Sequence, residues 1–167
     1  LKRMRAGVIP AGVAALFNVA KRDAKIATTF DLGFTLGPRL NAAGRLSDMR
    51  LGIECLITDN EVTAQNLAKQ LDEINRERRE IEGDMRMQAM EYADSLFEDE
   101  ADAPPVICVF DPEFHEGVVG IVASRLIETY YRPTLVFTKS GDKYAASARS
   151  VKGFDVYNAL ESCSEHL

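Results

Sequence analysis

The stretch VICVFDPEFHEGVVGIVASRLIETYYRPTLVFTK, residues 106–139, contains the pattern that decides the fold of the C-terminal part of this chain. The apolar run 106–111 has the length and composition of a buried strand, and 134–139 repeats that pattern. Between them, 116–131 has the apolar spacing of a helix, which Pro133 stops. A strand, a helix and a strand in this order predict two parallel strands joined by a right-handed crossover.

A third strand and an N-terminal helical segment extend this unit. The turn SGD at 140–142 leads into a strand at 143–149, so residues 104–167 are predicted to form one α/β domain. Residues 1–57 hold short helical stretches that proline and glycine interrupt, and they show no clear strand pattern. The predicted fold class is therefore α/β, with a partial helical edge, a long connecting helix and a small domain containing the strand–helix–strand unit.

The segment 58–103 connects these two parts. Apolar residues recur at helical spacing from 61 to 97, which predicts one helix of about 55 Å at roughly 1.5 Å per residue. The sequence TDNE at its start has the form of a capping box, in which Thr58 caps the helix and Glu61 returns a hydrogen bond. The composition of 98–105, EDEADAPP, is that of a linker. A helix of this length is predicted to join two domains.

The composition excludes several classes of protein. A hydrophobic fraction of 46% and a charged fraction of 28% over 167 residues are typical of a soluble globular protein. No apolar run reaches the length of a membrane span or the core of a signal peptide, so the cytoplasm is the expected location. Cys55 and Cys108 stand near apolar residues, and all three cysteines, Cys55, Cys108 and Cys163, are predicted to be buried free thiols. The spacing of the two histidines offers no metal site, so no catalytic or metal-binding residue is assigned.

Charge is distributed unevenly along the chain. Residues 1–50 carry nine Lys/Arg and three Asp/Glu, residues 51–103 carry five and fifteen, and residues 104–167 carry six and eight. The basic first segment favours an anionic partner on that side of the molecule. A solvated acidic helix beside an ordinary basic segment would produce the same distribution.

The stretch GPRLNAAGRL, residues 37–46, combines two glycines, a proline and two arginines. One interpretation is a helix that ends at Gly44, with Arg39 and Arg45 lying against helix carbonyls and solvent. The other is a loop of small residues that lets a ligand approach the backbone while both guanidinium groups point at an anion.

The segment after the first predicted strand offers a second place for an anion. Gly117 and Gly120 are expected in the first turn of the following helix, where unpaired N–H groups and the helix dipole favour negative charge. Close packing of this helix on a strand would explain the same two glycines. His115, at the helix start, is more typical of a cap or a surface residue than of a ligand.

The third predicted strand ends in SARS, residues 147–150. Strand alternation places Ser147 and Arg149 on one face and Ala148 on the other. A hydroxyl beside a guanidinium suits a phosphate or a carboxylate. The alternative is the ordinary polar face of an edge strand.

Three stretches in this order, GPRLNAAGRL at 37–46, HEGVVGIVASRL at 115–126 and ASARS at 146–150, resemble the RecJ family of single-stranded-DNA-specific exonucleases, within the DHH phosphoesterase superfamily. The resemblance includes LDEINRERREIE of the long helix and covers essentially all 167 residues. It implies a catalytic DHH domain joined by a long helix to a DHH-associated α/β domain, with DNA entering between the two. It also implies 5′→3′ hydrolysis of single-stranded DNA in repair and recombination, with Mn²⁺ or Mg²⁺ activating water.

The resemblance assigns phosphate contacts near the 5′ end of the strand to both domains. It implies that Asn41 and Arg45 face the DNA from the first domain and that Ser147 and Arg149 face it from the second. The candidate phosphate-binding residues are therefore Asn41, Arg45, His115, Gly117, Gly120, Ser147 and Arg149, with Arg39 and Ser150 as further candidates.

The family motifs that bind metal are expected before residue 1, and its Gly-Gly-His motif after residue 167. The chain is therefore expected to be an internal fragment that positions substrate and has no activity by itself. The implied partners are single-stranded DNA and other DNA-repair proteins, with no membrane. Two other functions stay open: another DHH-superfamily phosphodiesterase, acting on oligonucleotides, cyclic dinucleotides or pyrophosphate, and a non-catalytic interaction module.

Overall fold

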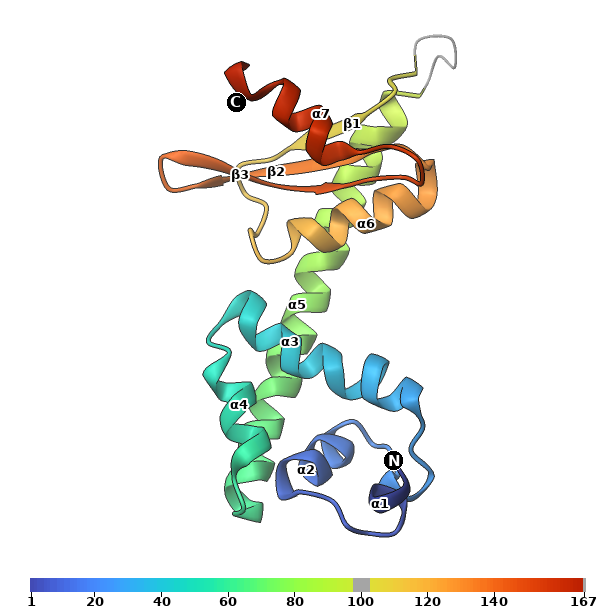
Figure 1. Cartoon of the computed structure of the whole chain (residues 1–167). Helices are drawn as coiled ribbons and strands as arrows, with labels where there is room; N and C mark the ends of the chain where they lie inside the picture. Colours follow the sequence, from blue (N-terminus) through green and yellow to red (C-terminus); the bar gives the residue numbers. More distant parts are fainter. Residues whose placement is uncertain (98–102, 167) are drawn as a thin grey trace. The chain divides into compact units, whose positions relative to one another are not determined.

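The computed structural model describes residues 1–97 and 103–166, which form two compact units, Leu1–Arg79 and Glu80–Leu167 (Figure 1). The helix α5, Glu61–Ser95, contributes its first part to one unit and its last part to the other. The long helix predicted over 61–97 is therefore present almost in full, whereas most of the linker predicted at 98–105 lies outside the described residues. No helix within the described ranges has the length and apolar character needed to cross a membrane.

The start of α5 differs from the predicted capping box. The backbone N–H of Thr63 donates to Oδ1 of Asn60 at 2.9 Å, and the N–H of Asn60 donates to Oγ1 of Thr58 at 3.2 Å. Asn60 is therefore the residue that caps the helix, and the prediction that Thr58 does so is wrong. Both residues can cap, and the structure begins the helix at Glu61, directly after the second of them.

The first unit is helical. Its elements are α1 (Lys2–Arg5), α2 (Ala11–Val19), the 3-10 turn η1 (Ala24–Ile26), the π-helical segment η2 (Asp31–Leu36), α3 (Gly37–Leu46), α4 (Arg50–Ile57) and the first part of α5. Within residues 1–79, all of which the structure describes, no strand forms, as the sequence predicts. The largest buried side chains of its core are Leu16, Phe17 and Leu71, from α2 and α5.

A backbone contact joins α2 and α4. Cys55 of α4 is fully buried, and its Sγ lies 3.9 Å from the carbonyl oxygen of Gly12 on α2. A Cβ added to Gly12 would lie 1.6 Å from the carbonyl oxygen of Cys55. Only glycine permits the two backbones to approach this closely.

The helical segment that leads into α3 begins with a local hydrogen-bond network. Oδ2 of Asp31 accepts from the backbone N–H of Thr28 at 2.9 Å and from its hydroxyl at 2.7 Å. Arg22 Nε donates to Oδ1 of Asp31 at 3.1 Å. The hydrogen bonds from Thr28, together with the charge of Arg22, hold the pKa of Asp31 below its ordinary value.

This lowered pKa predicts how Asp31→Asn changes stability with pH. A carboxyl whose pKa is lower in the folded state stabilises the fold above its unfolded pKa, and that contribution disappears as the pH falls through the folded pKa. At about pH 7 the variant should melt below the unmodified chain, and the difference should shrink below about pH 4. Thermal melts followed by circular dichroism measure this.

The control for this prediction is Glu54→Gln, which neutralises an exposed carboxylate of the same unit. Its melting temperature should stay close to that of the unmodified chain at both pH values. A melting difference for Asp31→Asn that is the same at both pH values would show that the charge of Asp31 contributes nothing.

The second unit contains the predicted strand–helix–strand pattern. Its elements are the last part of α5, β1 (Ile107–Phe110), α6 (Val119–Tyr130), β2 (Thr134–Ser140), β3 (Lys143–Arg149), α7 (Val156–Ser162) and the 3-10 turn η3 (Ser164–His166). The strands follow the order β1-β2-β3, with β1 parallel to β2 and β2 antiparallel to β3 (Figure 1). This confirms the predicted α/β fold class.

The helix α6 covers one face of this sheet, and its core lies between them. Val136 of β2 and Val122 and Leu126 of α6 are fully buried there. The opposite face bears the exposed Phe110 and the exposed Cys108, because successive strand residues point to opposite faces.

All three cysteines are free thiols, as predicted, but only one of them is buried. Cys55 is buried, whereas Cys108 and Cys163 are exposed. Apolar neighbours in the sequence of a strand do not bury the residue between them, since they lie on the other face of the sheet. Burial raises the pKa of the Cys55 thiol.

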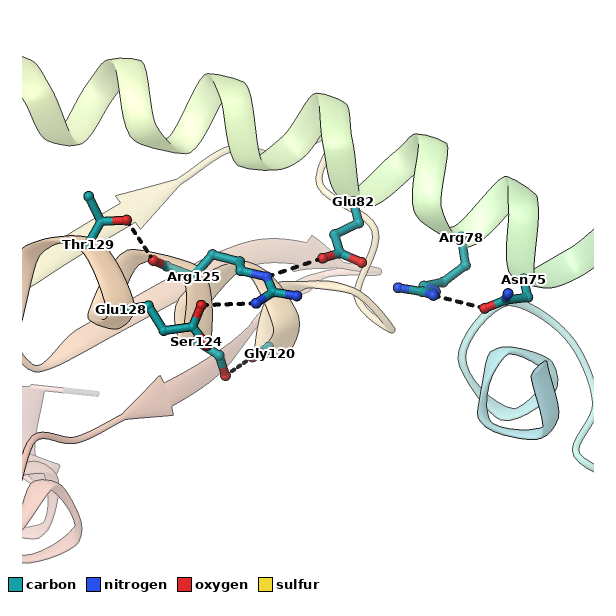
Figure 2. A network of polar contacts seen from close by, with 8 residues as sticks. All are labelled: Asn75, Arg78, Glu82, Gly120, Ser124, Arg125, Glu128 and Thr129. Atoms are coloured by element: carbon teal, nitrogen blue, oxygen red, sulfur yellow. Dashed lines mark hydrogen bonds and ion pairs between the residues drawn. The ribbon is translucent and has the colours of Figure 1, made fainter. Parts of the chain in front are cut away.

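The helix α6 also packs against the last part of α5. The Tyr130 hydroxyl donates to Oδ1 of Asp94 at 2.5 Å, and the Tyr130 ring stacks on Phe97 with centroids 5.2 Å apart. Loss of hydration and the Asp94 carboxylate together raise the pKa of Tyr130 to about 12. One turn earlier, Arg125 donates to Glu82 of α5 at 3.5 Å and to Glu128 of its own helix at 2.9 Å (Figure 2). These contacts hold α6 against the last part of α5.

Candidate functional site

The first turn of α6 and the end of β3 meet in the second unit. A Cβ added to Gly120, the second residue of α6, would lie 2.9 Å from Oγ of Ser147 and 2.9 Å from Nη2 of Arg149. Three of the candidate residues from separate parts of the sequence therefore lie together. Because Gly120 has no side chain, Ser147 and Arg149 occupy the space beside it. The same glycine therefore permits both the close packing of α6 on β3 and the polar cluster.

The strand register accounts for the direction of these side chains. Ser147 pairs with Val136 and Arg149 pairs with Thr134, and both partners are fully buried on the face that α6 covers. Ala148 pairs with Leu135 and lines the opposite face. The predicted alternation, with Ser147 and Arg149 on one face and Ala148 on the other, is confirmed.

A residue outside the candidate set completes this cluster. Arg149 Nε donates to Oγ of Ser124 at 3.2 Å, and Arg149 Nη1 donates to the carbonyl oxygen of Ala148 at 2.8 Å. The Ser124 hydroxyl in turn donates to the carbonyl oxygen of Gly120 at 3.0 Å (Figure 2). Helical spacing is the signal that could have found Ser124, because it follows Gly120 by four residues and shares its face.

The residues just before α6 form its N-terminal turn. Nδ1 of His115 accepts from the backbone N–H of Gly117 at 3.1 Å, and its carbonyl oxygen accepts from Val118 at 2.9 Å. The His115 side chain thus closes the turn that precedes α6 and does not cap the helix itself. The helix begins at Val119, so the prediction that Gly117 lies in its first turn is wrong, whereas Gly120 does lie there.

Ser150 closes the loop that follows β3. Its hydroxyl lies 2.5 Å from the carbonyl oxygen of Phe154 and 3.3 Å from that of Val151. The hydroxyl therefore has a backbone acceptor within its own loop, directly beside the last residue of β3. This contact supports the end of the strand that carries Arg149.

In the first unit, the whole stretch GPRLNAAGRL forms α3, Gly37–Leu46. The loop interpretation is therefore wrong, and the helix also continues beyond Gly44. Gly37 N–H donates to the carbonyl oxygen of Leu32, five residues back, in the π-helical segment that precedes α3. Pro38 follows and has no N–H to donate, which favours this irregular hydrogen-bond register.

The polar residues of α3 divide into two groups. Asn41 and Arg45 are four residues apart and both exposed, so they share one helix face, while Ala42 and Ala43 are buried. Arg39 has a side chain that is only 11% exposed; its Nε donates to Oδ1 of Asp72 on α5 at 2.7 Å. Its Nη1 donates to the carbonyl oxygen of Thr35 at 2.6 Å. Arg39 therefore holds α3 against α5 within this unit.

An open apolar hollow of about 920 Å³ lies on the face of the sheet opposite Ser147 and Arg149. Its lining consists of Cys108, Val109, Phe110, Leu135, Phe137, Lys143, Tyr144, Ala146, Ala148 and Leu160. No candidate residue lines it, so the hollow and the polar cluster are separate features of the second unit.

The close approach at Gly120 predicts that Gly120→Ala disturbs the cluster without unfolding the protein. The added methyl would meet Oγ of Ser147 and the far end of the flexible Arg149 side chain, and rotation about side-chain bonds can move both atoms away without shifting the backbone. We expect the melting temperature to change little and any anion affinity of the cluster to fall several-fold. Thermal melts and binding titrations on the same preparation measure both quantities.

Gly83→Ala is the matched control for this substitution. It adds the same methyl group to a helix of the same unit, at a position with no heavy atom within 4 Å. Its affinity should equal that of the unmodified chain, and its stability should rise slightly. An unchanged affinity for Gly120→Ala would mean that the guanidinium position has no influence on binding.

Comparison with known proteins shows which proteins this chain is similar to. Residues 103–167 match the DHHA1 domain. The single-stranded-DNA-specific exonuclease RecJ of Escherichia coli (strain K12) is 44% identical over 162 residues, which is 96% of this chain. The chain is homologous to a segment of RecJ. The corresponding exonuclease of Bacillus subtilis (strain 168) is 33% identical over 158 residues, or 93% of the chain.

Solved structures of RecJ share the fold. A crystal structure of RecJ in complex with Mg²⁺ from Thermus thermophilus matches 97% of the chain with a TM-score of 0.82 and 28% identity. A crystal structure of exonuclease RecJ bound to manganese matches 98% with a TM-score of 0.81. The chain spans only 28% of the length of the Escherichia coli relative and 24% of the Thermus thermophilus structure.

Proposed function

We propose that this chain is the part of a RecJ-like exonuclease that binds the backbone phosphates of single-stranded DNA near the 5′ end. The observation that carries the proposal is the meeting of Gly120, Ser147 and Arg149 at the first turn of α6. Homology to RecJ over 96% of the chain supports the substrate class.

The chemistry of this cluster suits a phosphate. A guanidinium can donate two parallel hydrogen bonds to phosphate oxygens, and a serine hydroxyl beside it can donate a third. The N-terminal end of α6 adds the positive end of the helix dipole at the same place. In the first unit, we propose that Asn41 and Arg45 contact further phosphates from the exposed face of α3.

The proposed reaction also requires a metal ion. Among the residues that the structure describes, no three His, Cys, Asp or Glu side chains come together as metal ligands. These residues therefore do not fit Mn²⁺ or Mg²⁺, and we assign no step of hydrolysis to them. We propose that the metal, which activates water in such enzymes, is held by other residues of a longer protein.

The homology to RecJ also supports a proposal about the cellular role of the whole enzyme. We propose a role in DNA repair and recombination in the cytoplasm, with 5′→3′ removal of nucleotides from single-stranded DNA as the reaction of the whole enzyme. Other DNA-repair proteins are the proposed protein partners.

A binding titration tests the proposed function. The purified chain is titrated with single-stranded DNA bearing a 5′ phosphate, with the same strand lacking it, and with duplex DNA, at about 50 mM and about 200 mM salt. We expect the phosphorylated single strand to bind most tightly and its affinity to fall as salt rises. Equal affinity for the duplex, or no binding at all, would contradict the proposal. In a further titration with a cyclic dinucleotide, tight binding would favour another member of the superfamily.

The chain by itself is expected to release no nucleotides. Its described carboxylates and histidines do not form a metal-binding group, so nothing in it is proposed to activate water. The measurement incubates the purified chain with end-labelled single-stranded DNA and Mn²⁺. Release of mononucleotides that follows the chain through purification would contradict the assignment of the metal site to other residues.

A further inference from the structure

We infer that Ser124 is a positioning residue, which holds the guanidinium of Arg149 in the orientation that receives a phosphate. The inference rests on the proposed function and extends it to a residue that the sequence motifs do not single out. It starts from the two hydrogen bonds of the Ser124 hydroxyl on α6. One joins it to Gly120 of the same helix and the other to Arg149 of β3.

The hydrogen bonds of the Ser124 hydroxyl have a defined direction. A serine hydroxyl has one proton to donate and lone pairs to accept with. Arg149 Nε can only donate, so the Ser124 oxygen accepts from it at 3.2 Å. The single proton of Ser124 is then directed to the carbonyl oxygen of Gly120, at 3.0 Å. The hydroxyl therefore links the backbone of the first helical turn to the guanidinium.

The same bonds decide which edge of the guanidinium faces a ligand. Of its five N–H groups, Nε–H is directed to Ser124 and one Nη1–H to the carbonyl oxygen of Ala148. The remaining protons lie on Nη1 and Nη2, and these two nitrogens form the terminal fork that binds two phosphate oxygens in parallel. Ser124 thus holds the guanidinium by the edge that a phosphate does not need.

Thr129 supplies a matched comparison on the same helix. Its hydroxyl also donates to the carbonyl oxygen four residues back, that of Arg125, at 3.1 Å (Figure 2). Such bonds within a helix are common for serine and threonine and carry no functional meaning alone. Ser124 differs because its oxygen also accepts from β3, and this second bond is the one that the inference concerns.

Nuclear magnetic resonance tests the contact in the chain without DNA. In Ser124→Ala the Nε–Hε signal of Arg149 should shift and exchange faster with water, whereas in Ser124→Thr it should stay close to its original position. Thr129→Val, which removes the matched hydroxyl, should leave the signal unchanged. An unchanged signal in Ser124→Ala would overturn the inference, whatever the DNA affinities are.

Binding of 5′-phosphorylated single-stranded DNA then tests the consequence. Ser124→Ala should weaken binding by about tenfold, which is the size of one hydrogen bond to a charged group. Ser124→Thr should restore most of the affinity, and Thr129→Val should bind like the unmodified chain. In the background of Arg149→Ala, the further change Ser124→Ala should have no effect, because a positioning residue acts through the group it holds.

The outcomes separate the inference from the proposed function. Loss of binding in Arg149→Ala with full binding in Ser124→Ala would overturn the inference and leave the proposed function intact. Additive losses in the double variant would show that Ser124 acts independently of Arg149, which also overturns it. Full binding by Arg149→Ala, or no binding by the unmodified chain, would overturn the proposed function and the inference together.

Discussion

Replacing Gly12 by alanine is expected to destabilise the first unit by at least about 3 kcal/mol, because the new methyl group has no space. Its Cβ would lie 1.6 Å from the carbonyl oxygen and 2.6 Å from the carbonyl carbon of Cys55. Both atoms belong to the backbone of α4, so no side chain can rotate out of the way. Relief requires that α2 and α4 separate, which opens the core around Leu16 and Phe17.

Chemical denaturation followed by circular dichroism measures this loss. The control is Gly33→Ala, which adds the same methyl to a helical glycine of the same unit where no heavy atom lies within 4 Å. That variant should be as stable as the unmodified chain or slightly more stable, because alanine favours helix. If Gly12→Ala unfolds at the same denaturant concentration as the control, α2 and α4 do not pack as closely as described.

Replacing Arg149 is expected to have the largest effect on DNA binding. Arg149→Ala removes the guanidinium fork, so affinity for 5′-phosphorylated single-stranded DNA should fall by about tenfold or more. Arg149→Lys keeps the charge but offers an ammonium in place of two parallel donors, and it should lose much of the same affinity. Alanine should also reduce the slope of log affinity against log salt by about 0.7, the contribution of one phosphate contact on a single strand.

Lys139→Ala is the control for Arg149. It removes one positive charge from the same sheet, at an exposed position of β2 that pairs with Tyr144 and faces away from α6. Its affinity should change little, and both arginine variants should melt like the unmodified chain, since Arg149 is exposed. Early melting of Arg149→Ala with unchanged affinity of the folded protein would make Arg149 a structural residue.

Local patterns were sufficient for most of the fold. The strands over Ile107–Phe110, Thr134–Ser140 and Lys143–Arg149 lie within one residue of their predicted bounds, and α5 ends two residues before its prediction. Periodicity, turn residues and strand length act over a few neighbouring residues, so a sequence displays them directly. The parallel pairing of β1 and β2 follows as well, because the helix between them has few other ways to pack.

Part of the candidate site was also visible in the sequence. Alternation along β3 was enough to place Ser147 and Arg149 on one face, and close packing on a strand was one of the two interpretations of Gly117 and Gly120. The sequence alone showed neither that the two features meet nor that Ser124 joins them. Whether the two features meet depends on the position of α6 along the sheet. This position is set by the packing of α6 on β2 and β3.

The tertiary structure alone decided the roles of several other residues. The sequence makes Arg39 a candidate ligand of an anion, whereas in the structure its guanidinium donates to Asp72, 33 residues away along the chain. Cys108 is exposed because it lines an open hollow on its face of the sheet, at which Leu160 of α7 also lies, although its neighbours in sequence are apolar. Sequence patterns determine which residues share a face of a helix or strand. Which partner each face then meets is set by packing between distant segments, and this packing appears only when the chain is folded.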